Sequence, residues 1–335
     1  MKVTVAVVGA TGYTGAEIVR LLAGHPNAEV AVVTSERQAG QPLRSSCPWL
    51  ATDLVLTRFD PCGWEVDVVF LCQENGFAMH HAPSLAERSR VIDLSADFRL
   101  TDLAQYPAWY RLDHPGGLEP WPVYGLTELA DRRALGQARI VANPGCYPTA
   151  SLLALMPLAE AGIVAGTPVI DAKSGVSGAG RSKQETDFLF SELAGGFKPY
   201  GVTGHRHTPE IEQQLGMTVR FTPHLLPIPR GICSTIHVPV TPGVNADTVR
   251  GLWRSRYEGR TCVAVLDEGF PSTKHVLGSN RCLLAAAVDE RTGYAILVSV
   301  IDNLVKGAAG QAIQNMNLML GLPEETGLPL AGVWP

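Results

Sequence analysis

The first thirty-four residues constrain the fold more than any other stretch of this chain. Residues 3–8 are an apolar, β-branched run that is typical of a buried parallel strand. Gly9, Gly12 and Gly15 follow in a GxxGxxG pattern, and an apolar-faced helix and a second strand over residues 29–34 come next. Strand, glycine turn, helix and strand within about 30 residues form the βαβ unit that binds a dinucleotide at the helix N-terminus. The alternative is a packing turn without a ligand.

The end of the second predicted strand distinguishes NAD from NADP. Ser35 and Arg37 are suited to a ribose 2′-phosphate, whereas Glu36 is the residue type of an NAD site. We therefore predict NADP. The residues assigned to its binding are Gly9, Thr11, Gly12, Tyr13, Thr14, Gly15, Ser35 and Arg37.

Composition excludes several classes of protein. A chain of 335 residues is long enough for two domains, and its net charge of −5 argues against nucleic-acid binding. No apolar run approaches the ~20 residues of a membrane span. The seven cysteines are odd in number and lack CxxC spacing, which predicts a reducing, cytoplasmic location.

A cysteine lies between turn residues near the middle of the chain. A predicted strand over residues 139–142 leads into Asn143-Pro144-Gly145-Cys146, and Pro148 suits the first turn of a following helix. That helix should kink or split at Pro157. Amide N–H groups and the helix dipole would favour a thiolate at Cys146. The alternative is a buried structural cysteine.

Two further segments carry candidate chemistry. In residues 204–212, Thr208 reads as a helix N-cap and Pro209 as the first helical residue, so His205 and His207 precede a helix with Glu210 in its first turn. The glycine-rich residues 173–181 can approach a ligand with their backbone. A zinc site at the two histidines is the alternative, but no partner ligand stands at suitable spacing and we predict no metal.

The fold class follows from the later strands. Predicted strands at residues 219–222, 234–240, 261–266, 282–288 and 294–301 lack regular βα alternation. They indicate a mostly antiparallel sheet in a second, α+β domain. We predict an α/β chain with an N-terminal Rossmann-type NADP-binding domain and this α+β domain.

A dinucleotide, an activated thiol and nearby histidines together suggest reduction through a thioester. The thiolate attacks an acyl carbonyl and expels a leaving group, and hydride then reduces the thioester. A histidine near the sulfur lowers its pKa and donates a proton when the hemithioacetal collapses.

Five segments carry a resemblance to a known family: residues 9–15, 143–149, 173–181, 205–211 and 302–307. They resemble the N-acetyl-gamma-glutamyl-phosphate reductases of arginine biosynthesis, which are related to aspartate-semialdehyde and glyceraldehyde-3-phosphate dehydrogenases. The resemblance runs nearly end to end. It implies NADPH-dependent reduction of N-acetyl-L-glutamyl 5-phosphate to the 5-semialdehyde, with release of phosphate.

The resemblance also implies roles for individual residues. Cys146 would be the nucleophile and His207 the acid/base, with His205 and Glu210 in support. Further cofactor residues are Ser177, Gly178 and Asn303, and Asn143 and Arg206 are assigned to the substrate. Arg99 is assigned to the substrate on its position, in the loop after a predicted strand over residues 91–94, where parallel sheets bind ligands and a guanidinium suits an anion. For Arg99 an ion pair with a neighbouring aspartate is the alternative.

Domain limits and assembly follow from the same resemblance. The last helix would rejoin the first domain, so that residues 1–145 plus 304–335 bind NADP and residues 146–303 form the catalytic and oligomerisation domain. A homodimer or homotetramer is expected.

One loop departs from the family pattern, and two alternatives stay open. Residues 70–76 replace the family's usual Leu-Pro-His-Gly type of loop, and Cys72 there is a candidate second thiol. The chain is alternatively a lysine-pathway reductase of a carrier-bound aminoadipyl phosphate, or a non-catalytic NADP-binding sensor. The residues around Cys146 and residues 174–181 favour the arginine enzyme, and intact Cys146, His207 and Glu210 argue against a sensor.

Overall fold

The computed structural model describes residues 2–181, 186 and 189–334. The chain forms two compact units, each with its own sheet. Unit 1 consists of Met1–Pro144, Gly180–Ser182 and Ala308–Leu328, and unit 2 of Gly145–Ala179, Lys183–Gly307 and Pro329–Pro335. Gly145 and residues 304–307 and 329–334, which the resemblance assigned to the first domain, fall in unit 2, and residues 180–181, assigned to the second domain, fall in unit 1.

Unit 1 is built on a parallel sheet of six strands in the order β2-β1-β3-β4-β6-β5. The strands are β1 (Val3–Val8), β2 (Ala28–Thr34), β3 (Val68–Leu71), β4 (Arg90–Asp93), β5 (Val123–Tyr124) and β6 (Ile140–Ala142). The strand order reverses direction at β1, and such a switch point is where parallel α/β sheets bind ligands. The glycine-rich residues 9–15 begin directly after β1, so the predicted Rossmann-type arrangement is confirmed.

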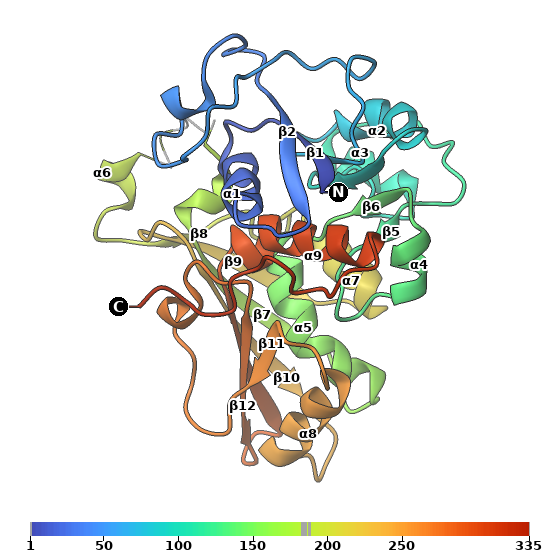
Figure 1. The fold of residues 1–335 in the computed structure, drawn as a ribbon. Helices are drawn as coiled ribbons and strands as arrows, with labels where there is room; N and C mark the ends of the chain where they lie inside the picture. Colours follow the sequence, from blue (N-terminus) through green and yellow to red (C-terminus); the bar gives the residue numbers. More distant parts are fainter. Residues whose placement is uncertain (1, 182–185, 187–188, 335) are drawn as a thin grey trace. The chain divides into compact units, whose positions relative to one another are not determined.

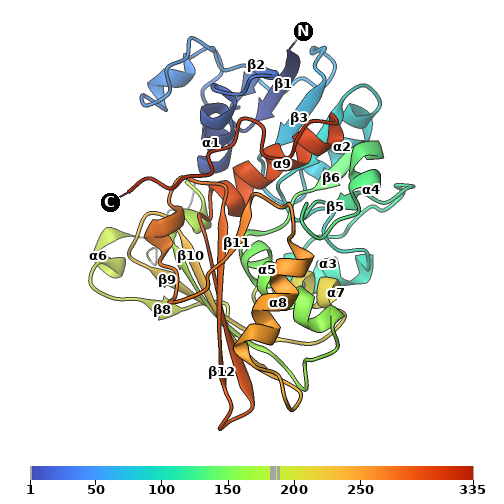
Figure 2. The same cartoon turned by 60° about the horizontal axis from the view of Figure 1, so that its bottom comes forward.

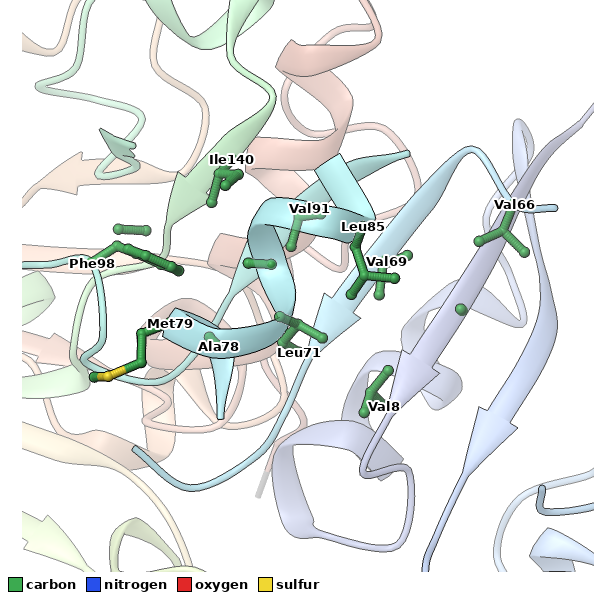
Figure 3. Close-up of a cluster of buried hydrophobic side chains, with 13 residues drawn as sticks. Val8, Val66, Val69, Leu71, Ala78, Met79, Leu85, Val91, Phe98 and Ile140 are labelled. Atoms are coloured by element: carbon green, nitrogen blue, oxygen red, sulfur yellow. The ribbon is translucent and has the colours of Figure 1, made fainter. Parts of the chain in front are cut away.

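The helical segments of unit 1 are α1 (Tyr13–Leu22), α2 (Ala78–Ala86), α3 (Tyr106–Tyr110), α4 (Arg132–Gln137), α9 (Gly310–Met319) and the short 3-10 turns η1 (Leu43–Ser45) and η2 (Leu103–Gln105). Helices α1, α2 and α9 contact the sheet, while α4 contacts α9 and α3 contacts η2. Figure 3 shows Met79 and Leu85 of α2 among the apolar side chains of the sheet, such as Val69 and Leu71. This apolar layer keeps the carboxyl ends of the strands in place.

Helix α9 comes from the end of the chain but lies beside α1 and α4 (Figure 1, red against blue and green). All ten of its residues are buried, including four amide side chains. Gln311 Nε2 donates to Gly125 O at 3.0 Å, and Asn315 Nδ2 donates to the same oxygen at 2.8 Å. Buried amides need such partners, so α9 is held by hydrogen bonds as well as by apolar packing.

Unit 2 contains a seven-stranded sheet in the order β11-β12-β13-β10-β7-β9-β8. The strands are β7 (Val169–Gly175), β8 (Lys198–Pro199), β9 (Arg220–Leu226), β10 (Ile232–Pro239), β11 (Val263–Val265), β12 (Cys282–Asp289) and β13 (Tyr294–Ile301). Neighbouring strands are antiparallel except for the pairs β11–β12 and β7–β9. The predicted mostly antiparallel sheet is confirmed. Strand β7 runs through Gly175, so the start of the predicted glycine-rich loop is in fact strand.

The helical segments of unit 2 are α5 (Cys146–Glu160), α6 (Phe190–Leu193), α7 (Thr208–Leu215), α8 (Ala246–Arg256), and the turns η3 (Val176–Ala179) and η5 (Thr273–Val276). A π-helical segment η6 (Val305–Ala309) spans the boundary to unit 1. Helices α5 and α8 pack against each other, with α5 lying on β10 and β13 and α8 on β12 (Figure 2).

The helix does not split at Pro157, one of the two outcomes predicted there, because α5 is continuous from Cys146 to Glu160. A proline in a helix leaves the carbonyl four residues earlier without its usual N–H donor. Here that carbonyl belongs to Leu153, and the hydroxyl of Tyr257 donates to it at 2.6 Å. Trp253 Nε1 donates to the next carbonyl, that of Ala154, at 2.8 Å. Helix α8 and its C-cap thus supply the partners that let α5 pass through the proline.

Within the described part of the chain, no helix has the length and apolar character needed to cross a bilayer.

Candidate active site

The turn formed by residues 9–15 (the glycine turn) is built by close backbone contacts. Gly9 has a φ of +87°, and a Cβ there would lie 2.6 Å from the carbonyl oxygen of Cys72. A Cβ on Gly15 would lie 2.3 Å from the carbonyl oxygen of Gly9. Neither position has room for a side chain, so both glycines are required for the helix to begin so close to the strand.

The start of α1 offers backbone donors. Gly12 is its N-cap in an extended conformation (φ −73°, ψ 165°) and supplies no side-chain cap, and the first turn contains no acidic residue. Thr11 and Thr14 are partly exposed at this point, and Tyr13 is 40% exposed. The first N–H groups of a helix and the positive end of its dipole suit a phosphate. The residues present therefore fit the pyrophosphate of a dinucleotide.

The end of β2 lies against the glycine turn. Gly9 N donates to Thr34 Oγ1 at 3.2 Å, and Thr11 Oγ1 donates to Ser35 Oγ at 3.4 Å. The Glu36 carboxylate accepts a hydrogen bond from the Phe59 N–H at 2.8 Å, and the Arg37 side chain is exposed. Glu36, the acidic residue that follows β2, is thus hydrogen-bonded to the backbone.

The second turn, residues 145–149 (the cysteine turn), opens unit 2. Gly145 is the N-cap of α5 in an extended conformation (φ −67°, ψ 155°), and Cys146 is the first helical residue, so Pro148 lies in the first turn as predicted. The Cys146 side chain is partly exposed. A Cβ on Gly307 would lie 2.8 Å from the Cys146 Cβ, so η6 packs its backbone directly against the cysteine. Glycine at 307 is what permits this approach.

Helix α7 reaches the cysteine turn through Glu210. This fully buried carboxylate accepts a hydrogen bond from the Gly145 N–H at 2.8 Å. His207 is the N-cap of α7, so the predicted cap at Thr208 is wrong by one residue. The buried His207 ring lies 6.0 Å, centroid to centroid, from the ring of Tyr147, the residue after Cys146. The structure therefore brings His207, Glu210 and the cysteine turn together.

His205 occupies a different environment from His207. Its ring packs edge to face against Tyr147, Tyr200 and Phe221, and burial lowers its pKa to about 3, with the nearby Arg206 charge adding to the shift. His205 Nδ1 accepts the His207 N–H at 3.1 Å. A neutral imidazole with an acceptor at Nδ1 carries its proton on Nε2. His205 thus orients the His207 backbone and is uncharged near neutral pH.

Three residues assigned to the cofactor cluster at the end of β7. Asn303 Nδ2 donates to Ser177 Oγ at 3.0 Å, and Asn303 Oδ1 accepts the Gly231 N–H at 2.7 Å. A Cβ on Gly178 would lie 3.8 Å from Asn303 Nδ2 and 3.0 Å from Ser174 Oγ. Ser177 and Asn303 are more than 120 residues apart in the sequence. They meet because β7 and β13, which precede them, both pair with β10.

The residues assigned to the substrate are more dispersed. Arg99 is buried, and its Nε and Nη2 donate to the carbonyls of Asn143 and Leu94, each at 2.9 Å. The Asn143 amide accepts from Asn315 Nδ2 at 3.0 Å and donates to the Ala308 carbonyl at 3.2 Å. The hydrogen bonds of Arg99 and Asn143 therefore hold the end of unit 1 that leads to Gly145 in one conformation. Arg206, in unit 2, is exposed between two buried histidines.

Sequence reasoning missed several residues of this region. Tyr200 Oη donates to Tyr147 Oη at 3.1 Å, and Tyr147 Oη donates to the His224 carbonyl at 3.2 Å, which fixes the ring beside Cys146. Only the position of Tyr147 next to the cysteine hinted at this. Cys72, the candidate second thiol, has its pKa raised far above the usual range by burial and by the charge of Asp93, which opposes formation of a thiolate.

No set of three or more His, Cys, Asp or Glu side chains is arranged to hold a metal ion within residues 2–181, 186 and 189–334.

Two family descriptions match this chain. Residues 4–138 match "Semialdehyde dehydrogenase, NAD binding domain" and residues 146–303 match "Semialdehyde dehydrogenase, dimerisation domain". Among solved structures, aspartate semialdehyde dehydrogenase II from Vibrio cholerae has a TM-score of 0.74 at 21% identity and covers 96% of this chain and 99% of its own. That likeness shows a shared fold.

Full-length relatives are much closer in sequence. The N-acetyl-gamma-glutamyl-phosphate reductase of Citrifermentans bemidjiense is 47% identical, with 99% of this chain and 100% of that protein aligned. The one of Desulforamulus reducens is 48% identical over 99% and 100% of the two chains. A probable chloroplastic N-acetyl-gamma-glutamyl-phosphate reductase of Arabidopsis thaliana is 48% identical over 97% of this chain and 84% of its own.

Proposed function

Because this chain belongs to the N-acetyl-gamma-glutamyl-phosphate reductase family, we propose that it reduces N-acetyl-L-glutamyl 5-phosphate to N-acetyl-L-glutamate 5-semialdehyde with release of phosphate. The observation that carries the proposal is Cys146 at the first position of α5, with Glu210 bonded to the preceding N–H. A partly exposed thiol at a helix N-terminus is suited to nucleophilic attack.

Cys146 carries the covalent steps of the proposed reaction. Its Sγ attacks the acyl carbonyl, the bond from that carbon to the phosphate oxygen breaks, and phosphate leaves as a thioester forms. Backbone N–H groups at the start of α5 and the helix dipole stabilise negative charge on the sulfur and on the developing oxyanion. Glu210 and Gly307 fix the turn from two sides, so that Sγ is presented in one geometry.

His207 is the proposed acid and base. It takes the thiol proton before the attack and returns it to the sulfur when the C–S bond of the hemithioacetal breaks and the aldehyde leaves. His205 is not suited to this exchange, because burial keeps it neutral and its Nδ1 already accepts the His207 N–H. We propose that His205 and Glu210 position His207 and Cys146.

When bound, NADPH would supply the hydride that reduces the thioester. We propose that the glycine turn, the start of α1 and the end of β2 hold its pyrophosphate and adenosine ribose. Engagement of Glu36 by the Phe59 N–H supports NADP over NAD, because this carboxylate is then turned to a backbone partner while Ser35 and Arg37 follow β2. Ser177, Gly178 and Asn303 are proposed for the nicotinamide end.

The substrate is anionic, and Arg206 is its proposed partner. Arg206 is exposed next to both histidines, and a guanidinium suits carboxylate or phosphate. Arg99 and Asn143 bond to backbone and amide groups around the strand end, which supports a contribution through ordering of residues 143–145.

The match of residues 146–303 to a dimerisation domain indicates a homo-oligomer. We propose a homodimer or homotetramer, which light scattering of the purified chain at several concentrations distinguishes. None of the seven cysteines, all of which lie in the described residues, forms a disulfide, which supports a reducing compartment such as the cytoplasm.

The reverse reaction tests the proposed function. The purified protein is given NADP and phosphate with one aldehyde at a time: N-acetylglutamate semialdehyde, aspartate semialdehyde, glyceraldehyde 3-phosphate, or a carrier-bound aminoadipate semialdehyde. The proposal expects the highest kcat/KM with N-acetylglutamate semialdehyde. A higher value with any of the others overturns the substrate assignment, and absence of turnover with all four supports a non-catalytic protein.

A further inference from the structure

Gly180 and Arg181 belong to unit 1, although the chain that leads to them, up to Ala179, belongs to unit 2. Its Nη1 donates to the carbonyl oxygen of Thr11, within the glycine turn, at 3.0 Å. Its Nη2 donates to the Ser46 carbonyl at 3.1 Å, and Nη1 also contacts Cys47 Sγ at 3.8 Å. The guanidinium carbon lies 6.0 Å from the centre of the exposed Trp49 ring. The guanidinium is thus held in a defined place beside the glycine turn.

The surroundings of Arg181 suit an anion. Thr11, whose carbonyl it contacts, has its hydroxyl 3.4 Å from that of Ser35 at the end of β2. Within the described residues, the Arg181 guanidinium contacts neutral groups, and its side chain is exposed. The nearby carboxylate of Glu36 is bonded to the Phe59 N–H. The positive charge of Arg181 therefore lies beside Thr11, whose hydroxyl reaches the strand end where βαβ units read the adenosine ribose.

We propose that Arg181 binds the 2′-phosphate of NADP and, with Arg37, sets the preference for NADP over NAD. The inference rests on the proposed function, since it assumes that unit 1 binds this cofactor. A guanidinium presents its donors in a rigid fork, so two can be anchored on backbone carbonyls while others face a phosphate. The anchoring fixes the group before the ligand arrives, which reduces the entropy lost on binding.

A purely structural role is the competing explanation. In that case Arg181 joins residues 180–181 to the glycine turn and to Ser46, and its loss alters the turn for every dinucleotide alike. The two explanations differ in one measurable respect. A phosphate contact affects only ligands that carry a 2′-phosphate, whereas a structural contact affects NADPH and NADH by the same factor.

The experiment measures dissociation constants by fluorescence titration of NADPH and NADH with the full chain. The variants are Arg181→Gln and Arg181→Lys, with Arg44→Gln as matched control, because Arg44 is an exposed arginine near Ser46 that pairs with Asp53 at 2.8 Å. Displacement by 2′,5′-ADP and by 5′-AMP is measured in parallel. Thermal unfolding reports whether each variant is folded.

We expect Arg181→Gln to weaken NADPH and 2′,5′-ADP by about tenfold or more, the scale of one hydrogen bond to a charged group, and to change NADH and 5′-AMP by less than about twofold. Arg181→Lys keeps the charge and should fall between, and Arg44→Gln should match wild type. Equal weakening of both cofactors, or no change in either, overturns the inference. A wild-type protein that binds neither cofactor instead refutes the proposed function.

Discussion

The glycine turn and the cysteine turn are the same local structure used for two purposes. Each is a helix start with a glycine N-cap in an extended conformation, Gly12 for α1 and Gly145 for α5. Neither glycine provides a side-chain cap, and neither first turn contains an acidic residue. Both helices thus present their first N–H groups and the positive end of the dipole to whatever lies in front of them.

The difference lies in what closes each turn. The glycine turn is closed by its own backbone, with Gly15 packed on Gly9, and its helix start carries no nucleophile. The cysteine turn carries Cys146 at the first helical position and is braced by a distant carboxylate, Glu210, and by Gly307. An open helix start alone is suited to binding a phosphate, whereas a nucleophile needs partners from elsewhere in the chain to hold one geometry.

The substitution Cys146→Ser should distinguish the roles of the two turns most clearly. A serine hydroxyl at this position is a far weaker nucleophile than a thiolate, so reductase turnover should fall to background. The glycine turn is untouched, so the dissociation constant of NADPH should stay within about twofold of wild type, because no cofactor contact is removed. Stopped-flow or steady-state assays measure the first quantity and fluorescence titration the second. Turnover near the wild-type rate would rule out Cys146 as the nucleophile.

The next largest effect is expected from His207→Asn. Loss of a positioned acid and base should lower kcat by ~10²–10⁴. The matched variant is His205→Asn, whose amide oxygen can still accept the His207 N–H, and it should lower kcat by less than about tenfold because it leaves the proposed proton carrier in place. The test is kcat over a pH series. A larger loss in His205→Asn than in His207→Asn would exchange the two assigned roles.

A methyl group in the glycine turn and one packed against the cysteine turn should affect different steps. Gly307→Ala places a Cβ 2.8 Å from the Cys146 Cβ, and Gly15→Ala places one 2.3 Å from the Gly9 oxygen. Each should destabilise the fold by about 1–3 kcal/mol through overpacking. Gly307→Ala should lower kcat and leave the NADPH dissociation constant unchanged, whereas Gly15→Ala should raise that constant. Urea denaturation and fluorescence titration check both. If either variant affected both readouts equally, the two turns would not act separately.

The smallest expected effect is on the pH dependence of stability. The pKa of His205 is lowered from 6.5 to about 3 in the fold, chiefly by burial. Below pH 6.5 this histidine therefore binds a proton in the unfolded chain but stays neutral in the folded chain. The free energy of unfolding falls as the pH drops from 6.5 toward 3. The slope from this group is at most about 1.4 kcal/mol per pH unit. In urea denaturation between pH 4 and 7, His205→Asn should show a shallower slope than wild type, and parallel curves would contradict this.

Much of unit 1 could be predicted because its signals are local. An apolar β-branched run, a GxxGxxG pattern and an amphipathic helix specify β1, the glycine turn and α1 through steric and periodicity rules that act over a few residues. Helix α9 was harder to place, because its buried amides Gln311 and Asn315 depend on acceptors nearly two hundred residues away. Apolar periodicity gives no information on such partners.

The misplaced features of unit 2 have the same origin. Local rules predicted that Pro157 would kink or split α5. The helix does not split, and the hydroxyl of Tyr257, a hundred residues later, donates to the carbonyl that the proline leaves without its usual donor. Local rules also placed the N-cap of α7 at Thr208, whereas the structure places it at His207, whose N–H is taken by His205 Nδ1.

By itself, the sequence determined which residues can carry the chemistry: a cysteine at a strand-to-helix turn, a His-x-His segment at a helix start, and glycines where no Cβ fits. These follow from backbone sterics and side-chain type, which are properties of short stretches. Only the tertiary structure decided how they are used. It set His205 apart from His207 by burial, bonded Glu210 to Gly145, and brought Arg181 to the glycine turn. Burial and hydrogen-bond partners arise between residues far apart in the chain, and those contacts exist only once it has folded.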